Sequence, residues 1–558
     1  MSLFPIVDGR ARFDASSNAD SDRYSAGIRF TQEGAARSMT SAGTFFNQGI
    51  PMSESGQVAL VDASSGLPVN VVWLSGLPIS NDRVCISNKP VSVVSSGIPY
   101  DSAGAVAATV APITTNATLD LVFAGASNDL LNPTSYTLTT DFIAPQYQVG
   151  AQYTVWDNGL VQKNFAQIVT FTRASTATYF NFAGTLTSAA VNEARFDYDP
   201  STLAARGLLI EESRANSIRN NTMQGAVAGT PGTLPTNWTG TTTPSNGINR
   251  DVVGVGTENG ITYIDIRFSG TTTGALFFSL RFEPANQIVA SNGQTWTSTI
   301  YARLIGGSLT NITQVNHVIV YSNAAGTGLT FGTGGITPTN AALNTQRFTR
   351  TTTASDATTA FVASYIQIEA NSGVAIDITL RIGLPQLELG AFATSVIPTT
   401  TTALTRAADA ASVNTLSPWY NAVEGTLYAE WVARLGVDQQ AFGLVDVGDG
   451  VRVRKRSTDQ YGLVVRDPTN RDLALNASPA ITEGQIIKVA GAYAINDLAL
   501  SGGGQSPATG STYSVVTATS AFIGGNVSAG ATYVNGHIRR ICYYPRRLSN
   551  ADLQTITT

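Results

Sequence analysis

Charge is scarce in this chain of 558 residues. Only 13% of the residues are charged, 33 Lys and Arg against 38 Asp and Glu, whereas globular domains carry roughly 25%. The net charge of −5 argues against non-specific binding to nucleic acid, which needs a basic surface. No apolar run approaches the roughly 20 residues of a membrane-spanning helix, and the opening MSLFPIVDGR lacks a signal-peptide pattern. We therefore expect synthesis in the cytoplasm, no nucleic-acid partner and no membrane insertion.

Histidine and cysteine are also rare. His317 and His537 are too few for a three-histidine zinc site, and Cys85 and Cys542 lie too far apart in sequence for a CxxC metal motif or a disulfide framework. Nucleophilic catalysis of the Ser-His or Cys-His kind needs a histidine beside the nucleophile. Both histidines lie in strand-like segments, which favours structural roles. We predict that the chain is not an enzyme and needs no metal or other cofactor.

Glycine, threonine, serine, asparagine and valine are plentiful, a composition typical of short strands joined by polar turns. Apolar residues alternate with polar ones over 264–268, 376–382 and 427–435. A period of two indicates antiparallel strands with one buried face. A short helix is expected after Ser549, because Asp552 follows it at capping-box spacing. The predicted fold class is all-β.

Three segments near the N-terminus share a Gly-x-Pro start, a polar turn and an apolar stretch, at 49–60, 76–86 and 97–108. Each predicts a β-hairpin. True repetition and coincidental hairpin chemistry in a glycine-rich chain both remain open. The N-terminal region is therefore expected to be rich in β-hairpins.

Thr/Gly/Pro-rich tracts at 229–247 and 398–402 are typical of linkers, because such tracts cannot pack a core. They divide the chain into four predicted parts. These are a β-rich N-terminal region (1–164), a junction (165–217), a middle β domain (218–400) and a C-terminal β domain (401–558).

The junction contains three characteristic strings, FTRASTATYF from residue 171, ARFDYDP from 194 and RGLLIEESRAN from 206. Together they resemble a module of bacteriophage virion proteins described as head spikes or tail fibres. The resemblance implies a virion protein of a tailed bacteriophage, made in the host cytoplasm and released by lysis. It also implies that the N-terminal region attaches the protein to other virion proteins, and a homotrimer is expected because fibres are often trimeric.

The two β domains carry resemblances of their own. LPTNW from residue 234, TIYARL from 299 and LPQLELG from 384 resemble carbohydrate-binding-module jelly rolls of xylanases and phage fibres. EGTLY from residue 424 and GHIRRI from 536 resemble laminin-G or concanavalin-A-like jelly rolls. They imply two jelly-roll β-sandwich domains after the N-terminal attachment region.

Sugar binding needs aromatic faces for stacking and polar groups for hydroxyls. Trp238 is the leading aromatic candidate for a ligand contact, because it lies in a Thr/Gly/Pro-rich loop that suggests exposure, although the residue pattern favours capping of the sandwich edge over ligand binding. Arg452 and Arg454 share a strand face that could meet an acidic glycan or a neighbouring subunit. The predicted carbohydrate-binding residues are Trp238, Tyr301, Trp419, Tyr420, Arg452 and Arg454.

Paired carboxylates would suit a glycan hydrolase, which uses two acids roughly 5–10 Å apart. Adjacent acids on a strand point to opposite faces, and an Asp-Tyr-Asp-Pro string favours turn hydrogen bonds. Structural roles are therefore expected for the candidate pairs, which are Glu211 with Glu212, Asp197 with Asp199, and Asp446 with Asp449.

The predicted function is non-catalytic adhesion by a virion fibre or spike that binds a host surface glycan. Several weak sites on one particle would raise avidity. A structural capsid-decoration or tail-adaptor protein without sugar binding is the alternative. A glycan depolymerase is the second alternative.

Overall fold

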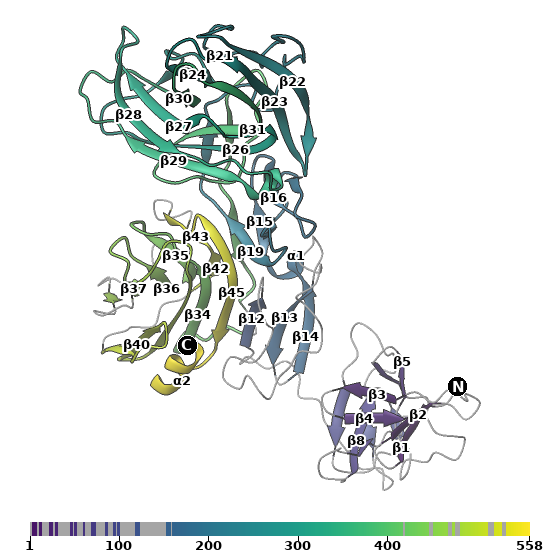
Figure 1. Ribbon diagram of the computed structural model, residues 1–558. Coiled ribbons are helices and arrows are strands. Elements are labelled where there is room, and N and C mark those ends of the chain that lie inside the picture. The colour runs from purple at the N-terminus through teal and green to yellow at the C-terminus, as the bar shows by residue number, and fades with distance from the viewer. Residues whose placement is uncertain are drawn as a thin grey trace.

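The protein is described by a computed structural model (Figure 1). It describes strands between residues 3 and 157 and, from residue 159 on, the segments 159–416, 419–445, 450–466, 471–474, 480–511, 518–526 and 532–558. Within these residues the chain is almost entirely antiparallel β-structure, with short helices α1 (Phe165–Ile168) and α2 (Asn550–Ile556). The predicted all-β class is confirmed. The expected capping by Ser549 is also confirmed, because its Oγ accepts a 3.1 Å hydrogen bond from the Asp552 N–H.

Strands in the first hundred residues pair with their neighbours in sequence, so this region is rich in β-hairpins as expected, but the hairpins are not those that the turn pattern predicted. Four hairpins (β1–β2, β3–β4, β5–β6, β10–β11) accompany a small sheet of β7, β8 and β9. Ile50–Met52 and Ile98–Tyr100 were expected to pair with the apolar stretches that follow them. They pair instead with the strands that precede them, β5 and β10, because proline tolerates an edge and a nearer strand is available. The strands are β1 (Leu3–Val7), β2 (Arg10–Phe13), β3 (Asp22–Ser25), β4 (Ile28–Thr31), β5 (Phe45–Asn47), β6 (Ile50–Met52), β7 (Leu60–Val61), β8 (Pro68–Trp73), β9 (Val84–Ser87), β10 (Val93–Ser95) and β11 (Ile98–Tyr100).

The middle sandwich consists of two facing sheets. One has the strand order β22-β23-β31-β26-β29, and the other has the order β21-β24-β30-β27-β28 with β25 beside β30. Ile264, Ile266 and Phe268 alternate into its core and are at most 1% exposed, as their spacing predicted. The strands are β21 (Thr239–Gly240), β22 (Ile248–Glu258), β23 (Ile261–Thr271), β24 (Leu276–Arg281), β25 (Ile288–Val289), β26 (Thr295–Gly307), β27 (Ile312–Ser322), β28 (Gly328–Gly335), β29 (Arg347–Thr353), β30 (Phe361–Ala370) and β31 (Ala375–Leu389).

The C-terminal sandwich also has two sheets. Their strand orders are β14-β13-β12-β45-β34-β39-β40-β41 and β15-β33-β42-β35-β36-β37-β38. Trp431, Val489 and Leu500 are fully buried in its core. The strands are β12 (Thr118–Val122), β13 (Gln152–Asp157), β14 (Gly159–Asn164), β33 (Ala410–Val413), β34 (Glu424–Val432), β35 (Gln439–Val445), β36 (Gly450–Lys455), β37 (Tyr461–Arg466), β38 (Arg471–Ala474), β39 (Ile486–Ala494), β40 (Asp497–Gly502), β41 (Ala508–Gly510), β42 (Ser520–Ile523), β43 (Gly525–Asn526), β44 (Thr532–Tyr533) and β45 (Gly536–Tyr544).

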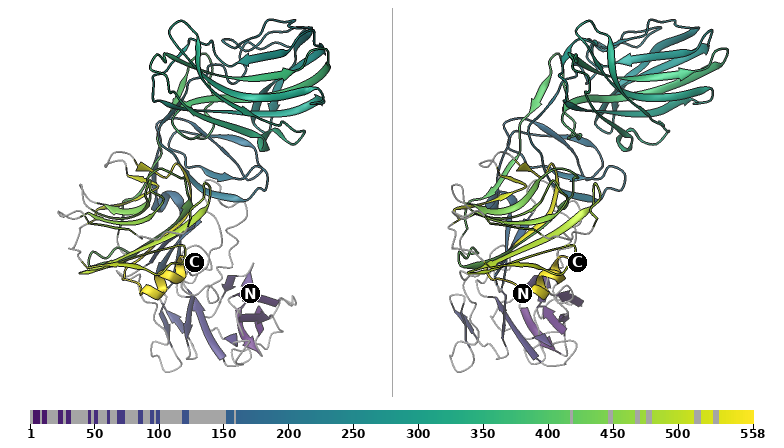
Figure 2. Two further views of the ribbon diagram at one scale, coloured as in Figure 1. Left: turned by 60° about the vertical axis from the view of Figure 1, so that its left-hand side comes forward. Right: turned by 90° about the vertical axis from the view of Figure 1, so that its left-hand side faces the viewer.

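The junction lies between the two sandwiches in the views of both Figure 1 and Figure 2. Its strands join sheets formed mostly by later residues: β15 pairs with β33, β19 with β45 and β20 with β32. Strands β12–β14 likewise extend a C-terminal sheet from within the predicted N-terminal region, and the four-part division stays a prediction. The junction strands and β32 are β15 (Thr170–Thr172), β16 (Ala177–Phe180), β17 (Leu186–Ala189), β18 (Phe196–Tyr198), β19 (Ala205–Ile210), β20 (Arg214–Asn216) and β32 (Leu404–Arg406).

Candidate functional site

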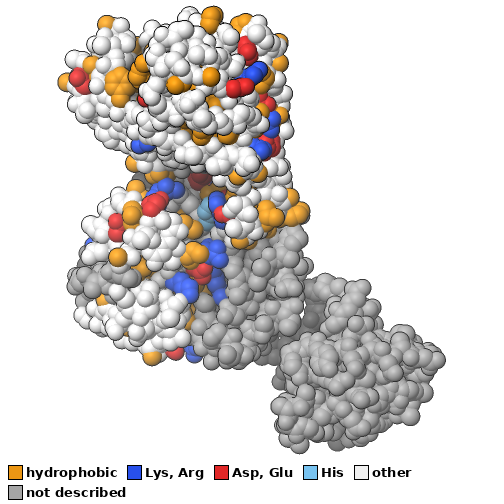
Figure 3. Space-filling model, viewed as in Figure 1, with side chains coloured by type: hydrophobic (Ala, Val, Ile, Leu, Met, Phe, Trp, Pro, Cys, Tyr) orange, Lys and Arg blue, Asp and Glu red, His pale blue; other side chains and the backbone are white. Residues whose placement is uncertain are grey.

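A cavity of about 510 Å³ opens where the junction and the two sandwiches meet, and we call it the interdomain cleft. Charged side chains of both signs and a histidine gather at the waist between the sandwiches (Figure 3). Ligand sites commonly measure roughly 300–1,000 Å³, so the cleft is large enough for a small ligand. Its polar and aromatic lining includes Tyr179, Phe180, Asp197, Asp199, Arg206, Tyr301, Arg347, Ser395, Arg434, Glu483, Asn535, His537 and Arg539.

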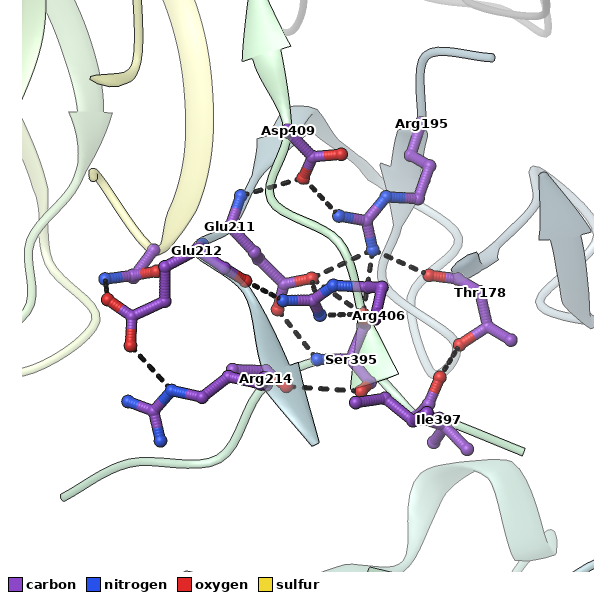
Figure 4. Close-up of polar contacts among 12 residues, drawn as sticks. Thr178, Arg195, Glu211, Glu212, Arg214, Ser395, Ile397, Arg406 and Asp409 are labelled. Atoms are coloured by element: carbon purple, nitrogen blue, oxygen red, sulfur yellow. Dashed lines mark hydrogen bonds and ion pairs between the residues drawn. The ribbon is translucent and has the colours of Figure 1, made fainter. Parts of the chain in front are cut away.

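Three arginines and two carboxylates form a buried charge cluster, which reaches the cleft lining at Glu211: Arg173, Arg195, Glu211, Arg406 and Asp409. Figure 4 labels Arg195, Glu211, Arg406 and Asp409. Arg195 bridges both acids, with Nη1 at 2.9 Å from Glu211 Oε2 and Nη2 at 2.5 Å from Asp409 Oδ2. Arg406 pairs with Glu211 at 2.6 Å, and Arg173 pairs with Asp409 at 3.1 Å. The cluster therefore ties the junction to the chain that leads into the C-terminal sandwich.

Glu211 is held ionised within this cluster. Burial alone would raise the pKa of its carboxyl, but the charges of Arg406 and Arg195 and hydrogen bonds from Ser395 lower the pKa well below its ordinary value. Glu212 points elsewhere, to Arg214 at 2.6 Å, as expected for adjacent residues. With its oxygens engaged by neighbours, Glu211 serves the architecture of the site.

Asp197 and His537 form the polar pair on the cleft wall. Asp197 Oδ2 lies 2.7 Å from His537 Nε2, and Oδ1 accepts a 2.7 Å hydrogen bond from the Phe180 N–H. The His537 side chain keeps 15% of its surface exposed. The sequence favoured a structural role for His537 because the residue lies in a strand-like GHIRRI string. No sequence pattern identified Asp197, 340 positions earlier, as its partner.

Asp199 closes a turn beside this pair. It accepts hydrogen bonds from the backbone N–H groups of Ser201 and Thr202 and pairs with Arg206 at 2.8 Å. Burial opposes ionisation of Asp199, but the hydrogen bonds from Ser201 and Arg206 lower its pKa far below the ordinary value. The predicted turn bonding of the Asp-Tyr-Asp-Pro string is confirmed at Asp199, which stays an anion.

Tyr301 on β26 and Arg347 on β29 are cross-strand partners, and both line the cleft. The Tyr301 ring packs with Ile261, Leu343 and other apolar side chains and is 1% exposed. Its hydroxyl has no hydrogen-bond partner within the described part of the chain. The Arg347 guanidinium lies 5.8 Å from the ring centre and donates to Thr299 and Thr394 through Nη2.

Trp238 is not exposed as its loop composition predicted. It is 6% exposed and packs edge-on against Phe282, with ring centres 4.9 Å apart. The loop folds back through backbone bonds from Val227 to Thr233 and from Trp238 to Pro235, which seats the ring in the core of the middle sandwich. The exposure suggested by the loop composition is thus corrected, and the buried ring agrees with the other interpretation of Trp238, in which it caps the sandwich.

The other predicted sugar-binding residues are not brought together. Trp419 is 3% exposed and packs against Tyr543, as does the half-buried Tyr420. Arg452 is buried beside Gln440, and Arg454 lies 3.9 Å from Asp438. Of the six, Tyr301 alone lines the interdomain cleft. Carbohydrate binding by the six stays a prediction.

His317 has the structural role that its strand pattern predicted. It is 1% exposed, and its Nε2 lies 2.9 Å from Ser298 Oγ. Burial, with a smaller effect of Arg350, lowers the pKa of His317 to about 3. Asp446 and Asp449 lie outside the described residues. Across the described segments, no group of three acidic, histidine or cysteine side chains is placed to hold a metal ion, and no helix is long and apolar enough to cross a membrane.

No protein-family model and no curated protein matches the chain. Among solved structures it is similar to a sialidase CBM40 module from Ruminococcus gnavus bound to α2,3-sialyllactose, with 15% identity, a TM-score of 0.22, and coverage of 25% of this chain and 84% of that one. It is also similar to a tandem CBM22 domain from Paenibacillus barcinonensis, with 11% identity, a TM-score of 0.19, and coverage of 59% and 97%. A sialidase from Trypanosoma rangeli in complex with the inhibitor DANA gives 10% identity, a TM-score of 0.22, and coverage of 100% and 98%.

These neighbours include carbohydrate-binding modules and enzymes. Sialidases are enzymes, so their presence among the neighbours contradicts the prediction that the chain is not one, and that prediction is withdrawn. No activity is assigned in its place, because TM-scores of 0.19 and 0.22 do not carry a neighbour's activity over to this chain. We therefore base its function on its own residues.

Proposed function

We propose that this protein binds a glycan and that the interdomain cleft receives it. One observation carries the proposal: the cleft combines half-buried aromatic rings, Tyr179 and Phe180, with a carboxylate and an imidazole, Asp197 and His537, around about 510 Å³. Aromatic rings stack on the apolar face of a sugar, and polar groups placed at a few points fix its hydroxyls. A saccharide uses both kinds of surface.

We propose further that the chain is a spike or fibre of a bacteriophage virion and that the glycan belongs to the host surface. Support comes from the sequence resemblance of the junction. The same junction segments supply Tyr179, Phe180, Asp197 and Arg206 to the cleft. Attachment to other virion proteins through residues 1–164 and a homotrimeric state belong to this proposal, because repeated weak sites gain avidity on one particle.

The binding proposal is tested with the full chain on an array of bacterial surface glycans. Asp197→Asn keeps a hydrogen-bond acceptor for Phe180 but removes the charge beside His537, and we expect at least about tenfold weaker retention. Asp377→Asn is the matched control, since Asp377 pairs with Arg267 on an exposed face of the middle sandwich. Equal retention by both variants, at equal melting temperatures, would remove the cleft as the site.

Two further measurements separate the alternatives. Reducing ends released from a retained polysaccharide would assign depolymerase activity to the site. Immunogold labelling of particles tests the virion assignment, which fails if the protein is absent from the particle. Particle labelling without glycan retention would favour a decoration or adaptor protein.

A further inference from the structure

The cleft holds one arginine whose charge is not matched by a carboxylate. Arg206 pairs with Asp199, Arg434 with Glu483, and Arg539 with Glu430. Arg347 also lines the cleft, but its hydrogen bonds go to the Thr299 hydroxyl and the Thr394 carbonyl, and it forms no ion pair with a carboxylate among the described residues. Its Nε has no hydrogen-bond partner there. Arginine binds carboxylates through paired N–H donors, so Arg347 has donor capacity for an anion.

The Tyr301 hydroxyl is a second hydrogen-bond donor without a partner among the described residues, and it lies beside Arg347 in the cleft lining. Because this hydroxyl is buried, the missing partner costs stability unless a ligand or a water supplies the bond. Burial raises the pKa of Tyr301, with Arg347 acting in the opposite direction, so the phenol remains a donor at neutral pH. Tyr301 and Arg347 are paired in register on adjacent strands, so both donors belong to one rigid sheet.

The carboxylates near Arg347 are engaged by other groups. Asp197 Oδ2 lies 2.7 Å from His537 Nε2 and 3.8 Å from Arg206, and Asp199 is paired with Arg206. The buried Glu388 carboxylate accepts hydrogen bonds from the N–H and the hydroxyl of Thr394, whose carbonyl in turn accepts a hydrogen bond from Arg347. Within the described residues, Arg347 therefore has no carboxylate as a direct partner.

We propose that the cleft selects an acidic saccharide, with the sugar carboxylate bound by the Arg347 guanidinium and the Tyr301 hydroxyl. This inference rests on the proposed glycan binding and adds the class of sugar. The hydroxyls of the same sugar ring would meet Asp197 and His537, which line the same cleft. A carboxylate would satisfy both unmet donors at once, whereas a neutral sugar offers no counter-charge to Arg347.

The test compares glucuronic and galacturonic acid with glucose and galactose, using saturation-transfer NMR and calorimetry on the full chain. Both acids, or one of them, should bind at least about tenfold more tightly than the neutral partner, and added salt should reduce this preference. Arg347→Gln should abolish the preference. Tyr301→Phe should weaken binding of the acidic sugar by roughly fivefold. The variant should melt at the same or a higher temperature, because the substitution removes an unpaired buried hydroxyl.

Arg350→Gln is the matched control. Arg350 lies on the same strand, against Gly334 of β28 and outside the cleft lining, so the preference for the acid should survive. The inference falls if neither acid binds, if acid and neutral sugar bind equally, or if Arg347→Gln leaves the preference intact. If the chain binds neutral sugars without preferring acids, and Asp197→Asn weakens that binding, then glycan binding at the cleft stands and the acidic class of sugar is rejected.

Discussion

His537 Nε2 on β45 and Asp197 Oδ2 on β18 lie 2.7 Å apart and connect the C-terminal sandwich to the junction inside the cleft. We expect His537→Gln and Asp197→Asn to be non-additive. A double-mutant cycle followed by thermal melting should give a coupling free energy of about 1 kcal/mol. Exposed Arg267 and Asp377 form the comparison pair, whose coupling should stay under about 1 kcal/mol. Strict additivity at His537 and Asp197 would contradict this contact.

The buried charge cluster should be costly to break. Glu211→Gln leaves Arg195 and Arg406 buried without one of their counter-charges, and removal of one partner of a buried pair costs about 3–5 kcal/mol. Glu212→Gln is the control, because the Glu212 side chain is 29% exposed and forms its ion pair with Arg214, outside the cluster. Denaturant titration of both variants should separate them clearly. Equal losses would place the stabilising charge outside the cluster.

The stabilisation that the buried charge cluster provides should also depend on pH in the acid range. The pKa of Glu211 is lowered in the folded chain, so its contribution is complete above the ordinary carboxyl pKa and is lost as pH falls toward the lowered value. Stability of the wild type should therefore drop in acid more steeply than that of Glu211→Gln. Melting temperatures measured from neutral pH downward test this, and parallel curves would be inconsistent with a strongly lowered pKa.

The sequence predicted local features well where a single strand or helix end decides them. Alternation placed Ile264 and Ile266 in the core, and capping chemistry placed α2 after Ser549. Asp265 is one of the polar residues that alternate with Ile264 and Ile266, so the pattern predicts that it is exposed. It is only 7% exposed, because Arg381 donates hydrogen bonds of 2.8 and 2.9 Å to its carboxylate. The partner arginine lies on a different strand, and the alternation pattern of a single strand carries no information about it.

Long-range pairing accounts for most of what the sequence did not predict. Strand β12 pairs with β45, so that Leu119 faces Tyr543 across more than four hundred residues of intervening chain. The cleft depends on the same kind of contact. Asp197 lies on β18 and His537 on β45 of one C-terminal sheet, whereas Tyr301 lies on β26 of the middle sandwich. Tyr301 was singled out for its aromatic ring, whereas its place in the site comes from its register with Arg347.

Trp238→Ala should act on stability before it acts on binding. The ring is buried against Phe282, and truncation of a buried tryptophan costs about 3–5 kcal/mol. Phe277→Ala is the matched control on the same sandwich, because Phe277 is 62% exposed and should change stability little. Thermal melting and glycan retention are measured together. Loss of binding by Trp238→Ala at an unchanged melting temperature would restore the ring as a sugar ligand.

His317 predicts a second acid-sensitive step, in the middle sandwich. Burial lowers its pKa from 6.5 to about 3, so the unfolded chain takes up a proton between these values that the folded chain does not. The sandwich should lose up to about 1.4 kcal/mol per pH unit across this window as pH falls. His317→Gln should remove that slope while lowering stability at neutral pH through the bond to Ser298. His537→Gln is the control for histidine loss, and an unchanged slope in His317→Gln would assign the acid sensitivity to another group.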